Sequence, residues 1–206
     1  MFDPTVYENL RVVLEGAVYD LDLAGTIRIT AREDLVDLAA MSRCYRIAFT
    51  LARGAADAGN AAAGLNGPQQ EAEELPPLTA RIELSAGLRD LAAEILEQPE
   101  SSPGCSIKII FTRVLEPGVT EEQACARSLA ALQQVWGDRF QIRQTISHEY
   151  GAESAGSGSG SLSHAVRRIH RMGLLFGRKF GEEVVEDIPP MVDHAVLTLQ
   201  QLAGGG

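Results

Sequence analysis

The residues between positions 163 and 181 carry the densest set of charged side chains able to bind an anion. Five basic residues and no acidic residue occur there, and on a helix of about 100° per residue they share an arc of about 120°. They are Arg167, Arg168, Arg171, Arg178 and Lys179. Ser163 precedes them as a candidate helix cap. This pattern favours docking on an acidic protein surface or the binding of a small anion.

An apolar arc runs beside the basic arc on the same projected helix, and glycines repeat every fourth residue along it. Glycines at this spacing let helices approach closely, as is best established in membranes. The self-association candidates are Ile169, Met172, Gly173, Phe176, Gly177 and Phe180. The sequence therefore predicts a cationic amphipathic helix over 164–180 that makes the protein a homo-oligomer. The alternative is that the apolar arc packs on the protein's own sheet.

The remainder of the chain is strongly acidic. The full sequence has 18 basic and 28 acidic residues and a net charge of −10, so removing the five basic residues above leaves 13 against 28. Because like charges one helical turn apart repel each other, we expect Asp and Glu side chains to face Arg167, Arg168 and Arg171. The acidic balance argues against nucleic acid and against an anionic membrane as partners.

Two stretches have the composition of flexible connections. Residues 151–162 are rich in Gly and Ser, which is typical of a tether, and their glycine spacing matches neither a P-loop nor a dinucleotide fingerprint. Backbone N–H groups at the end of this tether, with Ser163, Arg167 and Arg168, form an alternative site for phosphate or carboxylate. Residues 54–77 are rich in Gly, Ala, Pro and acidic residues and are predicted to be a mobile loop.

Side chains for metal binding or covalent catalysis are few and scattered. The sequence has four histidines and three cysteines: His148, His164, His170, His194, Cys44, Cys105 and Cys125. None falls at the spacing of a zinc site or a redox pair, and no serine lies in a nucleophile-elbow motif. We expect the histidines to face solvent or to make single hydrogen bonds. His148 and His164 are the better site candidates because they flank the tether.

These observations lead us to expect no metal, no cofactor and no catalytic activity. The leading hypothesis is a binding or assembly module that self-associates through its C-terminal helices. One alternative is a phosphate or nucleic-acid binder that uses the cationic helix, with a small anion as its ligand. The other is an enzyme whose site is assembled from residues distant in sequence.

Alternating apolar residues predict the strands that must position these segments. They occur at 26–30, 45–51, 79–84, 106–114 and 140–146. Residues 11–23 are apolar and β-branched, so we expect them to form a hairpin with 26–30. Short helices are expected over 31–41, after a capping-box pattern at Thr30, and over 88–95.

The best-defined unit lies at 106–147. Thr120 and Gln123 form a capping-box pattern before a helical apolar stripe, and Gly137 is placed to end that helix. Strand–helix–strand at this spacing favours a right-handed βαβ crossover, with an antiparallel return as the alternative. We therefore predict an α+β fold: a mixed β-sheet of about five to six strands with helices on at least one face, containing a βαβ unit, plus a C-terminal helical arm.

The predicted organisation is an α+β domain at 1–150, the tether at 151–162 and the helical arm at 163–206. Pro189 and Pro190 suit the first turn of the last helix. The first residues lack the charged and apolar regions of a signal peptide, and no run approaches the ~20 apolar residues of a membrane span. We expect a cytoplasmic protein with reduced cysteines.

Overall fold

Six strands with alternating side chains form a single antiparallel sheet in the computed structural model, which describes residues 5–52, 78–95, 104–138, 140–150 and 166–204. The strands are β1 (Ile27–Asp37), β2 (Ser42–Leu51), β3 (Leu78–Ala86), β4 (Ser106–Val114), β5 (Gln141–Tyr150) and β6 (Val166–Leu175). Their order across the sheet is β1-β2-β3-β4-β6-β5, and every neighbouring pair among the described strands is antiparallel.

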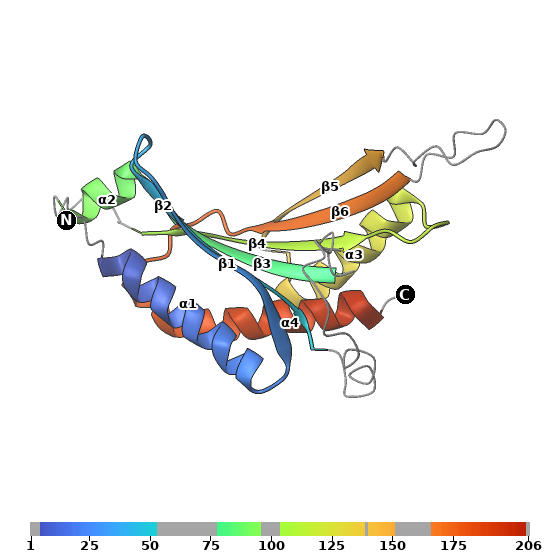
Figure 1. Ribbon diagram of the computed structural model, residues 1–206, viewed down its shortest axis with the longest axis horizontal. Helices are drawn as coiled ribbons and strands as arrows, with labels where there is room; N and C mark the ends of the chain where they lie inside the picture. The colour runs from blue at the N-terminus through green and yellow to red at the C-terminus, as the bar shows by residue number, and fades with distance from the viewer. Residues whose placement is uncertain (1–4, 53–77, 96–103, 139, 151–165, 205–206) are drawn as a thin grey trace, which may run out of the picture.

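The helices cover one face of this sheet. They are α1 (Thr5–Leu23), α2 (Leu88–Ile95), α3 (Glu121–Trp136) and α4 (Ile188–Gly204), with a 3₁₀ turn η2 (Glu182–Asp187) before α4. In Figure 1, α1, α3 and α4 lie below the sheet, and α2 lies at one end of it. We call the opposite side of the sheet the open face. The α+β class, the six strands and the C-terminal helix confirm the prediction, whereas the expected mixed sheet is antiparallel at every described strand pair.

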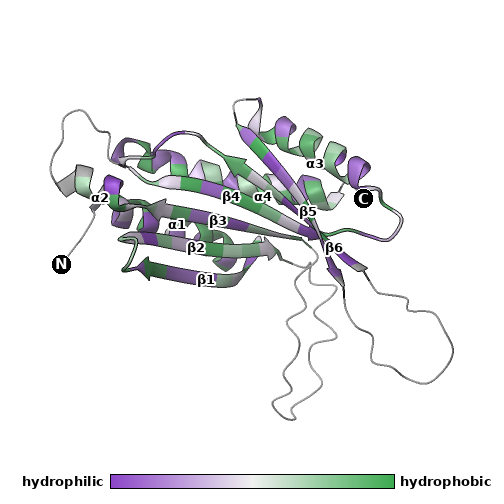
Figure 2. Cartoon of the chain, turned by 90° about the horizontal axis from the view of Figure 1, so that it is seen from above, coloured by the Kyte–Doolittle hydropathy of each residue, from purple (hydrophilic) through white to green (hydrophobic). Residues whose placement is uncertain are grey.

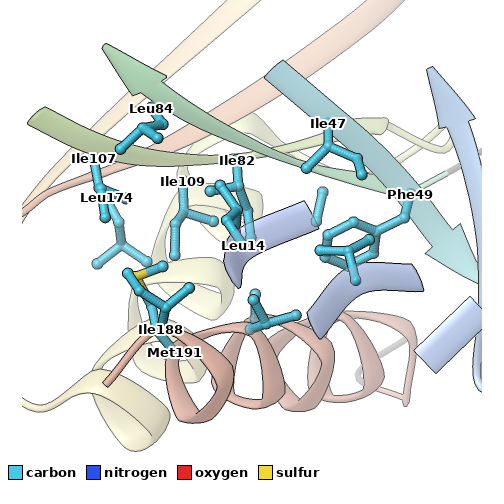
Figure 3. Packing of buried hydrophobic residues seen from close by; sticks show 14 of the residues in the cluster. Leu14, Ile47, Phe49, Ile82, Leu84, Ile107, Ile109, Leu174, Ile188 and Met191 are labelled. Atoms are coloured by element: carbon cyan, nitrogen blue, oxygen red, sulfur yellow. The ribbon is translucent and has the colours of Figure 1, made fainter. Parts of the chain in front are cut away.

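The core forms where α1 and α4 meet the helix-covered face. Leu14 of α1 and Met191 of α4 point toward Phe49, Ile82 and Leu174 of the sheet (Figure 3). The remaining apolar positions of α4 are also buried: Ile188, Val192, Ala195, Val196, Leu199 and Leu202. The helix begins at Ile188, so both prolines lie in its first turn, as expected. Figure 2 shows the matching alternation of polar and apolar residues along the strands.

The unit at 106–147 contains the predicted strands and helix. Thr120 and Gln123 form the capping box, with Gln123 N donating to Thr120 Oγ1 at 3.2 Å. Gly137 ends α3 with a φ of 70°. However, β4 and β5 are each antiparallel to β6, which lies between them. The two strands thus run in the same direction without being neighbours, so an adjacent βαβ pair is not formed.

The predicted cationic helix over 164–180 is wrong where the structure describes it, because 166–175 form strand β6. His170, Met172 and Leu174 alternate toward the core and are all fully buried. A short apolar run fits a helix or a strand equally well by periodicity. Here, backbone pairing with β4 on one side and β5 on the other decides for the strand. The glycines after position 172 therefore do not line one helix face.

The N-terminal prediction is also wrong in two places. Residues 11–23 belong to helix α1, whose buried Leu10, Leu14 and Val18 recur every four residues. The expected helix over 31–41 is the second half of β1 and its turn, because 31–37 pair with β2 beyond a bulge at position 30. Long-range packing outweighs the β-branched residues of α1 and the local capping pattern at Thr30 within β1.

Strands on both sides of the predicted tether belong to one sheet. β5 and β6 pair along 141–150 and 166–175, and α4 packs against α1. The predicted loop at 54–77 and the tether at 151–162, with Ser163 and His164 beyond it, lie outside the described residues.

Two adjacent leucines test the strand assignment. Leu174 is fully buried, whereas Leu175 is partly exposed on the open face. We expect Leu174→Ala to lower the free energy of unfolding by about 2–5 kcal/mol and Leu175→Ala to lower it by less than half as much. Urea denaturation of both variants measures this. A helix would place position 174 beside the basic arc, so equal or reversed costs would contradict the strand.

Candidate functional site

The basic residues of 166–180 are distributed over both faces of the sheet. Arg167 and Arg171 point to the open face, since the alternate positions 170, 172 and 174 are buried in the core. Arg168 lies on the helix-covered face, where it donates to the backbone carbonyls of Val119 and Glu116 at 2.8 and 2.7 Å. The acidic partner expected for Arg168 is therefore replaced by loop carbonyls. Lys179 does meet a carboxylate, that of Asp90, at 2.7 Å.

Three of the six self-association candidates are enclosed within the chain. Ile169, Met172 and Phe180 are 1%, 0% and 3% exposed, so their side chains are not available to a second subunit. Gly173 lies in the middle of β6, where a Cβ atom would meet the Arg143 carbonyl at 3.8 Å and the Lys108 side chain at 4.0 Å. Homo-oligomerisation itself stays a prediction.

The segment that follows β6 carries two of the candidates, Phe176 and Phe180, into an aromatic cluster. Phe176 contacts Trp136 and Phe140 edge-on, with ring centroids 5.9 and 5.1 Å apart. Phe180 lies 5.4 Å from Phe176, and Trp136 lies 5.8 Å from Phe140. The chain has only 11 aromatic residues, one of them a tryptophan, so this grouping concentrates four of them at one place. Edge-to-face geometry is the favoured arrangement of such rings.

These rings line a cavity of about 310 Å³, which we call the aromatic pocket. It lies where the end of α3, the start of α4 and the segment after β6 meet. Its other walls are Val135, Arg178, Asp187, Ile188, Pro190, Met191 and His194. The volume is at the lower end of the ~300–1,000 Å³ typical of small-molecule sites. Apolar walls with a few polar groups at the edge are also typical of such sites.

Hydrogen bonds hold the wall of the aromatic pocket in place. The indole N–H of Trp136 donates to Thr198 Oγ1 at 2.8 Å, and the Thr198 hydroxyl donates to the His194 carbonyl at 2.8 Å. Thr198 is fully buried, so these bonds are shielded from water. The indole is thereby fixed before any ligand enters, which lowers the entropic cost of binding.

Among the described residues that line the aromatic pocket, Arg178 carries a positive charge and Asp187 a negative one. The Arg178 guanidinium lies 4.8 Å from the centroid of the Phe180 ring, within cation–π range. Arg178 also lines a shallow depression of about 410 Å³ beside Lys108 and Lys179. The pocket therefore combines an apolar interior with one cation and one carboxylate for polar substituents.

A separate polar cluster lies between α3 and β6. His170 is fully buried, and its Nε2 lies 2.9 Å from Gln144 Oε1 and 3.9 Å from Cys125 Sγ. The amide of Gln144 donates its N–H to the Cys125 carbonyl at 3.1 Å. In this amide orientation Gln144 Oε1 must accept from His170, so Nε2 carries the imidazole proton.

This cluster resembles a thiol–imidazole pair in composition but not in geometry. A general base for the Cys125 thiol needs a free nitrogen lone pair facing sulfur. The nitrogen nearest the sulfur is Nε2, and it carries a proton that it donates to Gln144 Oε1. The other nitrogen, Nδ1, is buried and has no hydrogen-bond partner in the described part of the chain. Burial, aided by the Arg113 charge, lowers the pKa of His170 to about 4. The neutral imidazole is therefore a structural donor rather than an activated base.

The chain matches no family model, no curated protein and no solved structure. Within the described ranges, His, Cys, Asp and Glu side chains form no group of three or more able to hold a metal ion. Of the described helices, none combines the length and apolar character needed to cross a bilayer.

Sequence reasoning missed the aromatic pocket and the buried histidine. The pocket is assembled from four separate segments, around positions 136, 140, 176–180 and 187–194, so no local motif marks it. The available signal was the placement of Phe176 and Phe180 four residues apart in a chain with few aromatics. The hydrogen bond of His170 to Gln144 is within the expectation of a singly hydrogen-bonded histidine, but its full burial depends on the alternation of β6.

The buried imidazole predicts a stability change with pH. The folded-state pKa of His170, about 4, lies below its ordinary value of 6.5. Between these values the unfolded chain binds more protons, so stability is complete above pH 6.5 and falls as the pH drops toward 4. The loss amounts to roughly 3 kcal/mol when fully developed. Urea denaturation across this range should show a shallower decline for His170→Gln than for wild type. Parallel declines would contradict the buried neutral histidine.

Proposed function

We propose that this protein is a non-enzymatic binding module whose aromatic pocket takes the planar ring of a small organic ligand. The single observation that carries the proposal is the concentration of Trp136, Phe140, Phe176 and Phe180 around one cavity. In a fully packed core the rings would be buried by one another. Here Trp136, Phe140 and Phe176 remain partly exposed, whereas Ile188 and Met191 of α4 beside them are buried.

The walls favour a flat ring over a branched aliphatic group. Edge-to-face rings leave an aromatic face or edge available for a further ring, and each such contact contributes about 0.5–1.5 kcal/mol beyond area burial. Arg178 and Asp187 can orient polar substituents at the mouth. The ligand class that fits is therefore a small aromatic molecule with a polar or charged substituent.

We also propose that the protein is cytoplasmic. Cys44, Cys105 and Cys125 are all free thiols, and Cys105 is buried. Unpaired thiols are the usual state of cysteine in a reducing compartment. Self-association stays part of the proposal, although the buried apolar face of α4 favours a contact surface other than this helix.

Trp136 is the only tryptophan in the chain, so its fluorescence reports on the aromatic pocket directly. We expect benzyl alcohol, benzoate and benzylamine to change its emission in a saturable manner. Benzoate should bind more tightly than benzylamine if Arg178 is the stronger contact, and less tightly if Asp187 is. Phe140→Ala should weaken binding of the best probe at least about fivefold, since it removes one ring contact. Near-UV circular dichroism verifies that this variant keeps its packing.

The matched control is Tyr19→Ala, which removes an exposed aromatic residue on α1, outside the pocket lining. This variant should bind the probes as wild type does. Linear, non-saturating quenching with all three probes, or equal losses in Phe140→Ala and Tyr19→Ala, would overturn the proposal.

A further inference from the structure

A second cavity lies at the other end of α4. It is a groove of about 530 Å³ between α3 and the C-terminal turns of α4, and the end of β4 forms part of its wall. Its lining consists of Arg113, Arg127, Ser128, Ala130, Ala131, Gln134, Gln201, Leu202 and Gly204. It shares no lining residue with the aromatic pocket. We call it the α3–α4 groove.

Two polar atoms in the α3–α4 groove are buried without a partner. Ser128 is fully buried, and its hydroxyl makes no hydrogen bond to any described residue. The side-chain carbonyl oxygen of Gln201 is buried and unpartnered in the same way. A buried polar group left unpaired lowers the stability of the folded chain. The hydroxyl can donate to a ligand, and the Gln201 oxygen requires a donor from it.

Among the described residues that line the groove, both charged side chains are positive. Arg113 and Arg127 both line it, and neither forms an ion pair with any residue in the described part of the chain. Other arginines do meet carboxylates, since Arg11 contacts Glu8 at 2.9 Å and Arg46 contacts Glu33 at 3.2 Å. No acidic side chain occurs among the described residues that line the groove. Both guanidinium groups at the groove are therefore available to an anion.

The neighbour of Arg113 on the next strand adds no negative charge. His170 lies directly opposite Arg113 in the register of β4 and β6, and it is buried in the neutral form. The guanidinium therefore keeps its capacity for a charge-assisted, two-pronged hydrogen bond with an oxyanion.

We infer that the α3–α4 groove binds a small organic oxyanion, a phosphate or carboxylate compound that also carries a hydroxyl group. Arg113 and Arg127 hold the oxyanion, Ser128 donates to it, and the Gln201 oxygen accepts from the ligand hydroxyl. The groove is larger than a single oxyanion requires, which leaves room for the carbon skeleton. This site differs from the one expected at Ser163, Arg167 and Arg168, and it is independent of the aromatic pocket.

Titration calorimetry at low salt tests the inference with inorganic phosphate, glycerol 3-phosphate and malate as probes. Glycerol 3-phosphate or malate should bind more tightly than inorganic phosphate, because each adds a hydroxyl donor. The comparison of these two compounds tells phosphate from carboxylate as the preferred group. Affinity should fall with added salt, as expected for a guanidinium–oxyanion contact.

Arg113→Gln should weaken the best probe at least about tenfold, which corresponds to ~1.4 kcal/mol. Its matched control is Arg143→Gln on the open face, which should bind as wild type does. Ser128→Ala should weaken the probe while leaving the unliganded protein equally or more stable, because it removes a buried hydroxyl without a partner. Trp136 fluorescence titrations with the aromatic probes should be unchanged in all three variants.

Three results would overturn the inference. The first is the absence of binding heat for every probe at millimolar concentration. The second is an equal loss of binding in Arg113→Gln and Arg143→Gln, which would indicate general charge attraction. The third is a destabilised Ser128→Ala protein that binds every probe as tightly as wild type. This result would mean that the Ser128 hydroxyl is hydrogen-bonded to a buried water molecule rather than to a ligand.

Discussion

The insertion of β6 between β4 and β5 is the constraint on which the rest of the structure depends. It places His170, Met172 and Leu174 on the helix-covered face, where they must be shielded from water. It also brings the chain out of the sheet at Phe176, beside the end of α3 and the start of α4. The aromatic pocket exists because this exit point coincides with the meeting of the two helices.

The open face of a sheet that is covered on one side is in contact with water, and it must not associate with the sheet of another molecule. One row of side chains across β1 to β4 alternates in charge, from Glu33 to Arg46, Glu83 and Lys108. Successive contacts along this row are 3.2, 3.5 and 3.5 Å. Each exposed pair contributes only about 0–1 kcal/mol, so the row matters more for solubility than for folding. Charged edges and faces of this kind discourage pairing with other chains.

Elements with local sequence signals can be predicted from the sequence, whereas elements that depend on contacts with residues distant in sequence cannot. The capping box of Thr120 and the prolines before Met191 act within one turn, so they were readable, as were strands with clear alternation. Strand β6 was hidden because its apolar residues satisfy a helical and an alternating pattern together, and only its two neighbours in the sheet choose between them. The same holds for α1, where burial of Leu14 against the sheet outweighs the β-branched Val12 and Val13. Both cavities draw on segments far apart in sequence, so neither had a local signature.

Helices α3 and α4 line both proposed sites, which lie at different ends of α4. The aromatic pocket uses the N-terminal turns of α4, and the α3–α4 groove uses its C-terminal turns. Between them, Trp136 and Thr198 tie the two helices by a buried hydrogen bond of 2.8 Å. A shift of α3 along α4 would break this bond in a setting where water cannot replace it. The bond therefore opposes relative movement of the two helices, and we expect the two sites to bind their ligands independently.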